Sequence, residues 1–363
     1  MAERAAGRLG RRRVIGSLGA LAAAPWAMMP WCRAHAMTQA MAAEVATSND
    51  LLLVAGPANG RLGQWANLLC PLIGPALAAG GVLSWTPVGA ADGVTAANQF
   101  DAEVSPDGDT AMLLPGTAAL AQLIGDPRAR FDAGAWVAGF AGVSSTVVMG
   151  RAPLAELYTS PQVVVLAADP AGADLPTLLG LSLLGFNVKP VRPESISADI
   201  GAALAKGTID VATLSEAAVS NVPRWQQAGI ATLFTLGTIG ESGAFGVDPA
   251  FPAVPTLQNL LLAKGTDTTR PLPTAWRALA AAKQLTLGLV LPQLTPASRV
   301  AQWRLACASS IASLTIQAIA AAESLRLATQ PTAAMIVAAV TAPADAQLEL
   351  HQWLANRLGW RPS

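Results

Sequence analysis

The sequence has little of the chemistry on which most enzymes depend. Its 363 residues include two histidines, three cysteines and one tyrosine, and only 13% are charged. If His35 leaves with an N-terminal export segment, a Ser-His-Asp or Cys-His catalytic unit would have to use His351. A zinc site built from histidine and cysteine lacks both ligands and spacing. We therefore predict a protein that is not an enzyme and that holds no metal and no cofactor.

The few cysteines do not require a disulfide. Cys32 lies in the N-terminal segment, where Met29-Pro30-Trp31 is a poor lipobox. Cys70 and Cys307 are far apart, each in an apolar helical context. Export would permit a disulfide between them, but a lone buried thiol is ordinary, and two free buried thiols are favoured.

The N-terminal 36 residues are typical of an export signal. An arginine-rich patch at 11–16 precedes an apolar run, and a small-x-small site ends at Ala36. The arginine pair favours the twin-arginine route, so we expect cleavage after Ala36 and a periplasmic protein. The alternative is a membrane anchor, but Pro25 and Pro30 interrupt a run that is too short to span a bilayer.

The rest of the chain carries only a small net charge. The signal holds six of the 23 basic and one of the 23 acidic residues, so its removal leaves 17 and 22, a net charge of −5. No basic stripe remains, which excludes nucleic acid as a partner. No later segment is long and apolar enough to cross a membrane, which leaves a soluble exported chain.

The most informative stretch is 51–69. It predicts a short apolar strand, a loop of small residues and an amphipathic helix that begins near Arg61. Such a loop leaves unpaired backbone N–H groups at a helix N-terminus, which is an anion site made of main chain. The glycine spacing fits neither a dinucleotide fingerprint nor a P-loop. Arg61 either clamps a carboxylate or is a solvated residue at a helix end.

The same strand, small loop and helix recur at 110–124, 162–184 and 208–215. Loops at the same sheet edge converge on one site. Thr117 and Ser215 either bond ligand oxygens or cap their helices. The predicted ligand-binding residues are Ala58, Asn59, Gly60, Arg61, Pro115, Gly116, Thr117, Ala171, Gly172, Ala173, Thr213 and Ser215.

Alternating strands and helices predict an α/β protein with largely parallel sheets. We expect crossings between two lobes at 149–151 and in the Pro-rich run 248–256. Lobe 1 would then comprise 37–149 and 251–363, and lobe 2 would comprise 150–250. The Ala-rich helices at 297–327 and 344–358 would pack on the outside of lobe 1. Two crossings make a hinge, and a hinge makes a closing cleft.

Six segments, in order, carry a resemblance to a known family. They are 56–67, 105–114, 131–137, 203–210, 251–257 and 289–296, for example Phe-Pro-Ala-Val-Pro-Thr-Leu in the fifth. The chain resembles the extracytoplasmic substrate-binding proteins of tripartite tricarboxylate transporters, the Bug receptors. The resemblance implies a type II-like, two-lobed Venus flytrap with two interlobe crossings. It also implies a small carboxylate ligand, held by backbone N–H groups and water, and delivery to membrane permease subunits.

Three positions depart from the family pattern. Gly63 stands where the family commonly has Asp, and Pro-Glu-Ser-Ile at 193–196 replaces its usual Pro-Tyr-Lys-Gly. Asp169 and Asp174 flank a loop where small hydroxyl residues are usual. These two either face solvent, cap the helix at Leu175, which is the favoured interpretation, or select a ligand with an amine. The ligand stays open among dicarboxylates, tricarboxylates, amino acids and aromatic acids.

A ligand-sensing function is compatible with the same two-lobed fold. A ligand-sensing module would dock its closed form on a membrane signalling partner, and the sequence does not separate it from a transport receptor. An exported enzyme is disfavoured by the missing histidines. Oligomeric state and the cognate membrane partner also stay open.

Overall fold

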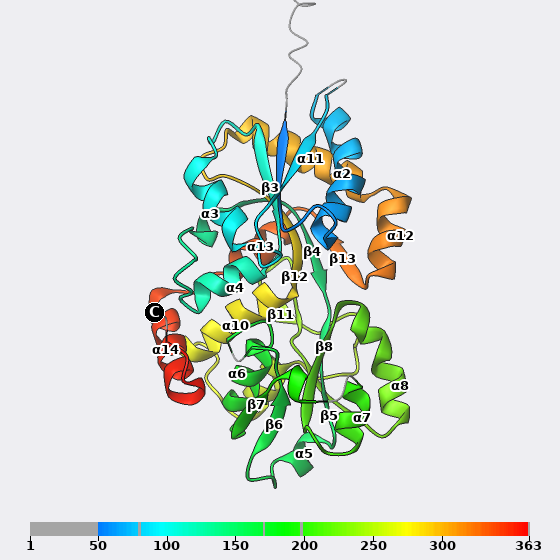
Figure 1. Ribbon diagram of the computed structural model, residues 1–363, viewed down its shortest axis with the longest axis vertical. Coiled ribbons are helices and arrows are strands. Elements are labelled where there is room, and N and C mark those ends of the chain that lie inside the picture. The colour runs from blue at the N-terminus through cyan, green and yellow to red at the C-terminus, as the bar shows by residue number, and fades with distance from the viewer. Residues whose placement is uncertain (1–49, 79–80, 170, 197–198, 362–363) are drawn as a thin grey trace, which may run out of the picture. The chain divides into compact units, whose positions relative to one another are not determined.

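The computed structural model describes residues 50–78, 81–169, 171–196 and 199–361 (Figure 1). All of them belong to one compact unit, residues 47–363. The predicted export signal, its cleavage site after Ala36 and the predicted start of lobe 1 lie outside the described residues. Within the described residues, no single helix is long and apolar enough to cross a bilayer, although two bent pairs of helices reach that length and composition together.

Lobe 1 is built on a six-stranded sheet with the order β13-β4-β12-β3-β1-β2. Strands β1 and β3 are parallel, and β12 runs antiparallel to both β3 and β4. The central strands are continuous apolar runs because helices cover both faces of the sheet, and every residue of β12 is buried. The strands are β1 (Leu51–Ala55), β2 (Ser84–Val88), β3 (Thr110–Leu114), β4 (Val137–Ser144), β12 (Leu285–Leu291) and β13 (Leu325–Ala328). The helices are α2 (Arg61–Leu77), α3 (Val94–Glu103), α4 (Thr117–Leu123), α11 (Ala297–Ile311), α12 (Leu314–Ala322) and α13 (Thr332–Ala339).

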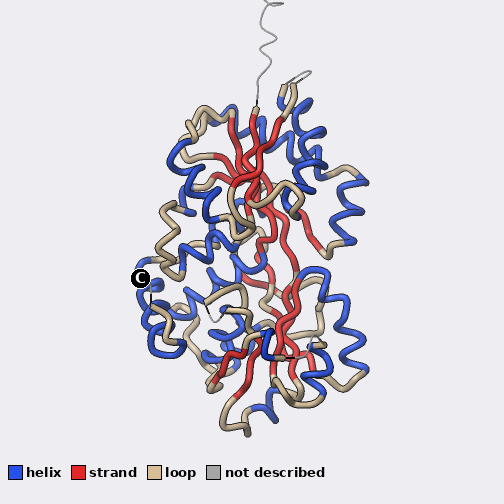
Figure 2. The backbone as a smooth tube through the Cα atoms, in the orientation of Figure 1, coloured by secondary structure: helices blue, strands red, loops and turns tan. Residues whose placement is uncertain are grey.

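Lobe 2 is built on a five-stranded sheet with the order β7-β6-β8-β5-β9. Figure 2 shows both groups of strands in red, each with its helices in blue. The strands are β5 (Thr146–Gly150), β6 (Val163–Leu166), β7 (Val188–Val191), β8 (Val211–Ser215) and β9 (Ala231–Thr235). The helices are α5 (Leu154–Leu157), α6 (Leu175–Leu183), α7 (Ile200–Ala205) and α8 (Val222–Gln227), with a 3₁₀ segment at Glu216–Asn221. The predicted two-lobed α/β fold is confirmed, but the sheets are mixed and not largely parallel, because the strands next to the passages, β4, β5 and β12, pair antiparallel with their neighbours.

The chain passes between the sheets twice. The first passage is at Ser145, between β4 and β5, and not at the predicted 149–151, because β5 already pairs with β8 and β9. The Ser145 hydroxyl donates to the buried carboxylate of Asp248, at 2.9 Å. The return runs through the short hairpin β10 (Thr238–Ile239) and β11 (Phe245–Gly246), then α9 (Leu257–Ala263) and α10 (Pro271–Gln284), into β12. The exact division into lobes remains a proposal.

Helix α10 joins the two lobes. It packs against α4 of lobe 1 and α6 of lobe 2, and against α14 (Ala344–Trp353) near the C-terminus. The buried indole N–H of Trp276 donates to the carbonyl of Pro176, in α6, at 2.9 Å. The sequence did not predict α10, β13 or the lobe 2 contact of α14. Helix α14 contacts lobe 1 as predicted, with His351 2.9 Å from the carbonyl of Leu123, but it also contacts lobe 2, where Trp353 donates to Ser182 in α6 at 3.1 Å.

Both remaining cysteines are buried and free. Cys70 lies in α2 and Cys307 in α11, and burial raises the pKa of each thiol to about 12. The prediction of two free buried thiols is confirmed.

Candidate functional site

Loops from both lobes line one cavity of about 330 Å³, which we call the Arg61 cavity. The loops lie at the carboxyl ends of β1, β3, β6 and β8, which is where ligands bind in open α/β sheets. The end of α10 closes one side. The lining residues are Ala55, Pro57, Gly60, Arg61, Leu62, Ala91, Pro115, Thr117, Ala173, Glu216, Ala282, Lys283, Leu285 and Thr286.

The N-terminus of α2 presents backbone N–H groups at this cavity. Gly60 is the N-cap and supplies no side-chain cap, and the first helical hydrogen bond is donated by Gln64 to Gly60, at 3.0 Å. The N–H groups of residues 61–63 therefore have no side-chain cap, and an uncapped N-terminus favours an anion. The N–H of Gly60 itself already donates to Pro57, at 2.9 Å.

Gly63 is required by the shape of the loop that precedes it. A Cβ atom at Gly63 would lie 2.1 Å from the carbonyl oxygen of Ala58. The loop folds back onto the first turn of α2 so closely that no side chain fits. Glycine at position 63 therefore has a steric cause.

Gly116 has a packing role in place of the predicted ligand-binding one. It is buried, its N–H donates to the carbonyl of Leu285 at 2.8 Å, and an added Cβ would lie 2.1 Å from the carbonyl oxygen of Ala282. This close approach ties the start of α4 to the end of α10. The amide of Gly116 has no capacity left for a ligand.

Arg61 is bound by two carboxylates of the protein. Its guanidinium lies 2.6 Å from Glu216 of lobe 2 and 3.0 Å from Glu323, the C-cap of α12. The indole N–H of Trp65 donates to the same Glu323 carboxylate, at 3.1 Å. The two roles predicted for Arg61, a ligand clamp or a solvated residue, did not include these ion pairs, and its role toward a ligand stays a prediction. Glu216 presents its carboxylate from a left-handed backbone with φ of 57°, which is uncommon for a residue other than glycine.

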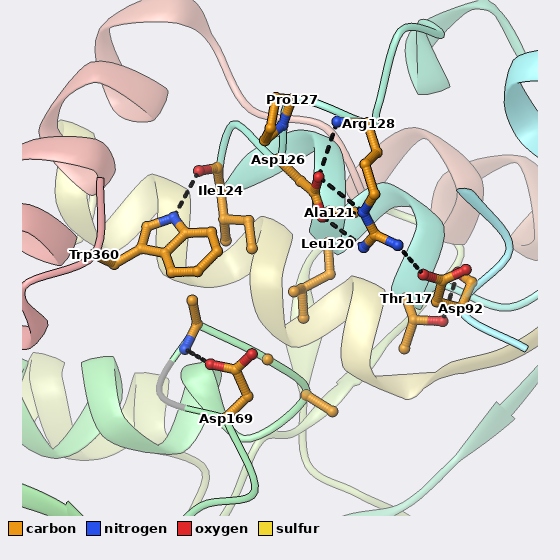
Figure 3. Close-up of a pocket in the computed structure, with 13 residues that line it drawn as sticks. Asp92, Thr117, Leu120, Ala121, Ile124, Asp126, Pro127, Arg128, Asp169 and Trp360 are labelled. Carbon is orange, nitrogen blue, oxygen red and sulfur yellow. Dashed lines mark hydrogen bonds and ion pairs between the residues drawn. The ribbon is translucent and has the colours of Figure 1, made fainter. Parts of the chain in front are cut away.

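A second cavity of about 490 Å³, the Trp360 cavity, shares Thr117 and Ala173 with the first. Figure 3 shows Arg128 between Asp92, at 2.9 Å, and Asp126, at 2.7 Å. The hydrogen bonds from Arg128 hold the pKa of Asp126 below its usual value. The cavity is lined by Asp92, Thr117, Leu120, Ala121, Ile124, Asp126, Pro127, Arg128, Asp169, Ala171, Gly172, Ala173 and Trp360.

The two aspartates of the lobe 2 loop do not cap α6. Asp169 lines the Trp360 cavity and accepts the N–H of Ala171 at 3.0 Å, as Figure 3 shows. Asp174 is the N-cap of α6, but its side chain makes no capping bond and accepts the N–H of Ala168 at 3.2 Å. The favoured capping interpretation was wrong, because both carboxylates bond within their own loop.

The comparisons with known proteins bear on this fold. No family model matches the sequence, and no curated protein sequence matches it. The crystal structure of a TctC solute-binding protein from Polaromonas, determined without a ligand, is 14% identical with a TM-score of 0.58. The match covers 84% of this chain and 97% of that one. The chain has the fold of a TctC solute-binding protein.

Two further solved structures are more distant in shape. MatC from Rhodopseudomonas palustris with bound malate is 17% identical with a TM-score of 0.47, over 84% of this chain and 97% of that chain. The periplasmic binding protein BugD is 15% identical with a TM-score of 0.48, over 85% and 97%. The resemblance that the sequence predicts is confirmed for the fold by the TctC structure alone.

On this TctC fold the predicted site residues divide into two groups. Gly60, Arg61, Pro115, Thr117 and Ala173 line the Arg61 cavity, and Ala171 and Gly172 line the Trp360 cavity. Their roles toward a ligand stay predictions. The others line neither cavity: Ala58, Asn59, Gly116, Thr213 and Ser215.

The residues outside the cavities have local reasons for their places. Ala58 and Asn59 are exposed on the outer side of the loop, since Ala58 turns its carbonyl back toward Gly63. The hydroxyl of Thr213 donates to Thr177 at 2.8 Å, and Ser215 pairs with Thr146 at the end of β8. Next to Ser215, it is Glu216 that lines the cavity. His351 lies 2.9 Å from the carbonyl of Leu123 and lines neither cavity.

Sequence reasoning missed Lys283 and Glu216. Lys283 lies in the last turn of α10 and lines the Arg61 cavity. The sequence did contain an indication of this position. Lys283 is the last cation of an Ala-rich segment and lies two residues before the buried strand 285–291. A cation is favoured at the C-terminus of a helix, and the strand that follows brings it to the sheet edge of the TctC fold.

Proposed function

We propose that the chain is an extracytoplasmic solute-binding receptor. It closes on a small organic acid and delivers the acid to the membrane permease of a tripartite tricarboxylate-type transporter. One observation carries the proposal: in a TctC fold, loops of both lobes line the Arg61 cavity, so one ligand there contacts both lobes.

The chemistry of the cavity supports an anionic ligand. A micromolar affinity corresponds to about 8 kcal/mol. Hydrogen bonds to a charged group contribute about 1.5–3 kcal/mol each, and a helix N-terminus adds about 0.3–1 kcal/mol. The uncapped N–H groups at the start of α2, together with Lys283, are sufficient for such an affinity.

Closure follows from the two passages between the lobes. A ligand that binds the closed form better shifts the population toward it. Ser145 and the segment through α9 and α10 are the positions at which a hinge would move. We place the working protein in the periplasm, after export by residues 1–36 and cleavage behind Ala36.

A ligand screen tests the proposal. The protein of residues 37–363 is heated with mono-, di- and tricarboxylates, amino acids and aromatic acids, and its melting temperature is compared with that of the protein alone. A ligand that binds only the folded form must raise the melting temperature. At about a hundredfold excess over Kd the stabilisation is about 2.7 kcal/mol.

The screen contradicts the proposal if no organic acid raises the melting temperature. Co-purification from membranes separates the transport receptor from the sensory alternative. A permease subunit supports transport, and recovery of a signalling kinase alone contradicts it.

A further inference from the structure

The charged side chains of the Arg61 cavity differ in whether they have partners within the protein. Arg61 is held by Glu216 at 2.6 Å and Glu323 at 3.0 Å. One guanidinium and two carboxylates leave this cluster with an excess of one negative charge. We call these three residues the Arg61 cluster. Because the guanidinium is already bonded to two carboxylates, it has little attraction left for a third.

The cavity also contains a cation that has no counter-ion among the described residues. Lys283 lines the cavity from α10 and has no ion pair or hydrogen bond with any described residue. Its ammonium has three donors and is a compact point charge, which suits one carboxylate. Among the described residues that line this cavity, the charged ones are Arg61, Glu216 and Lys283.

The hydroxyl groups that line the cavity already donate hydrogen bonds within the protein. Thr117 donates to the carbonyl of Asp92 at 3.1 Å. Thr286 donates within the protein, with Ser144 at 3.1 Å and the carbonyl of Gln284 at 3.4 Å as its partners. A carboxylate in the cavity therefore depends on Lys283 and on backbone N–H groups.

We infer that the Arg61 cavity takes an acid with a single carboxylate, paired with Lys283, and rejects an acid with a second anionic group. The inference rests on the proposed function and names its substrate class. A second carboxylate in the same cavity would be repelled by the excess negative charge of the Arg61 cluster. The bonds within the cluster also hold Glu216, and with it the edge of lobe 2, against α2.

Three variants separate the roles. Lys283→Met removes the cation and keeps most of the side-chain bulk, and Lys206→Met is the matched control at an exposed lysine outside both cavities. Glu216→Gln removes one negative charge of the Arg61 cluster. If Glu216→Gln fails to fold, Glu323→Gln makes the same change of charge from lobe 1.

Calorimetric titration uses acids matched in chain length, such as butanoate with butanedioate and hexanoate with hexanedioate, at constant ionic strength. We expect the best monocarboxylate to bind about tenfold or more tighter than its dicarboxylate partner. Lys283→Met should weaken it by about tenfold or more, as for loss of a charged hydrogen bond, and Lys206→Met should not change it. Glu216→Gln should bring the dicarboxylate closer to the monocarboxylate by about tenfold.

Two results would overturn the inference while leaving the receptor intact. They are a dicarboxylate that binds the unmodified protein as tightly as its monocarboxylate partner, and a Lys283→Met variant with unchanged affinity. Absence of binding by every acid would instead overturn the proposed function, and the inference with it.

Discussion

The contact between the first turn of α2 and the loop before it makes a sharp prediction for Gly63→Ala. A Cβ at Gly63 would lie 2.1 Å from the Ala58 carbonyl oxygen, whereas Cβ contacts under 3.0 Å essentially never occur. The loop must therefore move by about 1 Å. Overpacking of this kind costs about 1–3 kcal/mol, and alanine returns at most about 1 kcal/mol of helix propensity.

We expect Gly63→Ala to lower the free energy of unfolding by about 1–2 kcal/mol. Urea unfolding followed by tryptophan fluorescence measures it. Gly240→Ala is the control, because the nearest atom to its added Cβ is 4.0 Å away, and we expect a change within about 0.5 kcal/mol. Gly63→Ala should also bind the best acid more weakly than the unmodified protein, since Gly60 and Arg61 move with the loop. A variant as stable as the unmodified protein would refute the close approach of loop and helix.

Three further predictions follow from the interior. Ser145→Ala removes a donor from the buried carboxylate of Asp248 and should lower the free energy of unfolding by about 1–3 kcal/mol in urea titrations. Trp276→Phe leaves the buried carbonyl of Pro176 in lobe 2 without its donor. It should lower the free energy of unfolding by about 1–3 kcal/mol in the same assay. Burial raises the pKa of Cys70 and Cys307 from 9.0 to about 12. Their contribution to stability is therefore complete below pH 9 and is lost as the pH rises toward 12. In the double variant with Cys70→Ala and Cys307→Ala, the free energy of unfolding should fall less steeply as the pH rises above 9. A slope equal to that of the unmodified protein contradicts this.

Most strands and the helices that follow them could be predicted because their apolar runs are distinctive. The stretch 51–69 gave its strand and the helix start at Arg61 from local pattern alone. The first passage was placed late because strands β4 and β5 are both apolar, and only pairing with β8 and β9 assigns residues 146–150 to lobe 2.

The charged part of the site could not be predicted, because it is made by residues far apart in sequence. Arg61 meets Glu216 and Glu323 only in the folded chain. Lys283 lies in the segment between the Pro-rich run and strand 285–291, which was not assigned to a helix, so α10 and its place between the lobes were missed. Gly116 was misjudged since a small loop residue fits either a ligand or a close helix contact, and only the distance to Ala282 decides.

The central claim is that one acid in the Arg61 cavity contacts residues of both lobes. Hydrogen–deuterium exchange of residues 37–363, with and without the best acid from the screen, tests it most directly. The account predicts that the acid slows exchange at residues 61–63 of lobe 1 and at residues 173 and 216 of lobe 2 together. Slowed exchange in one lobe alone, or only at segments outside the Arg61 cavity, would contradict it.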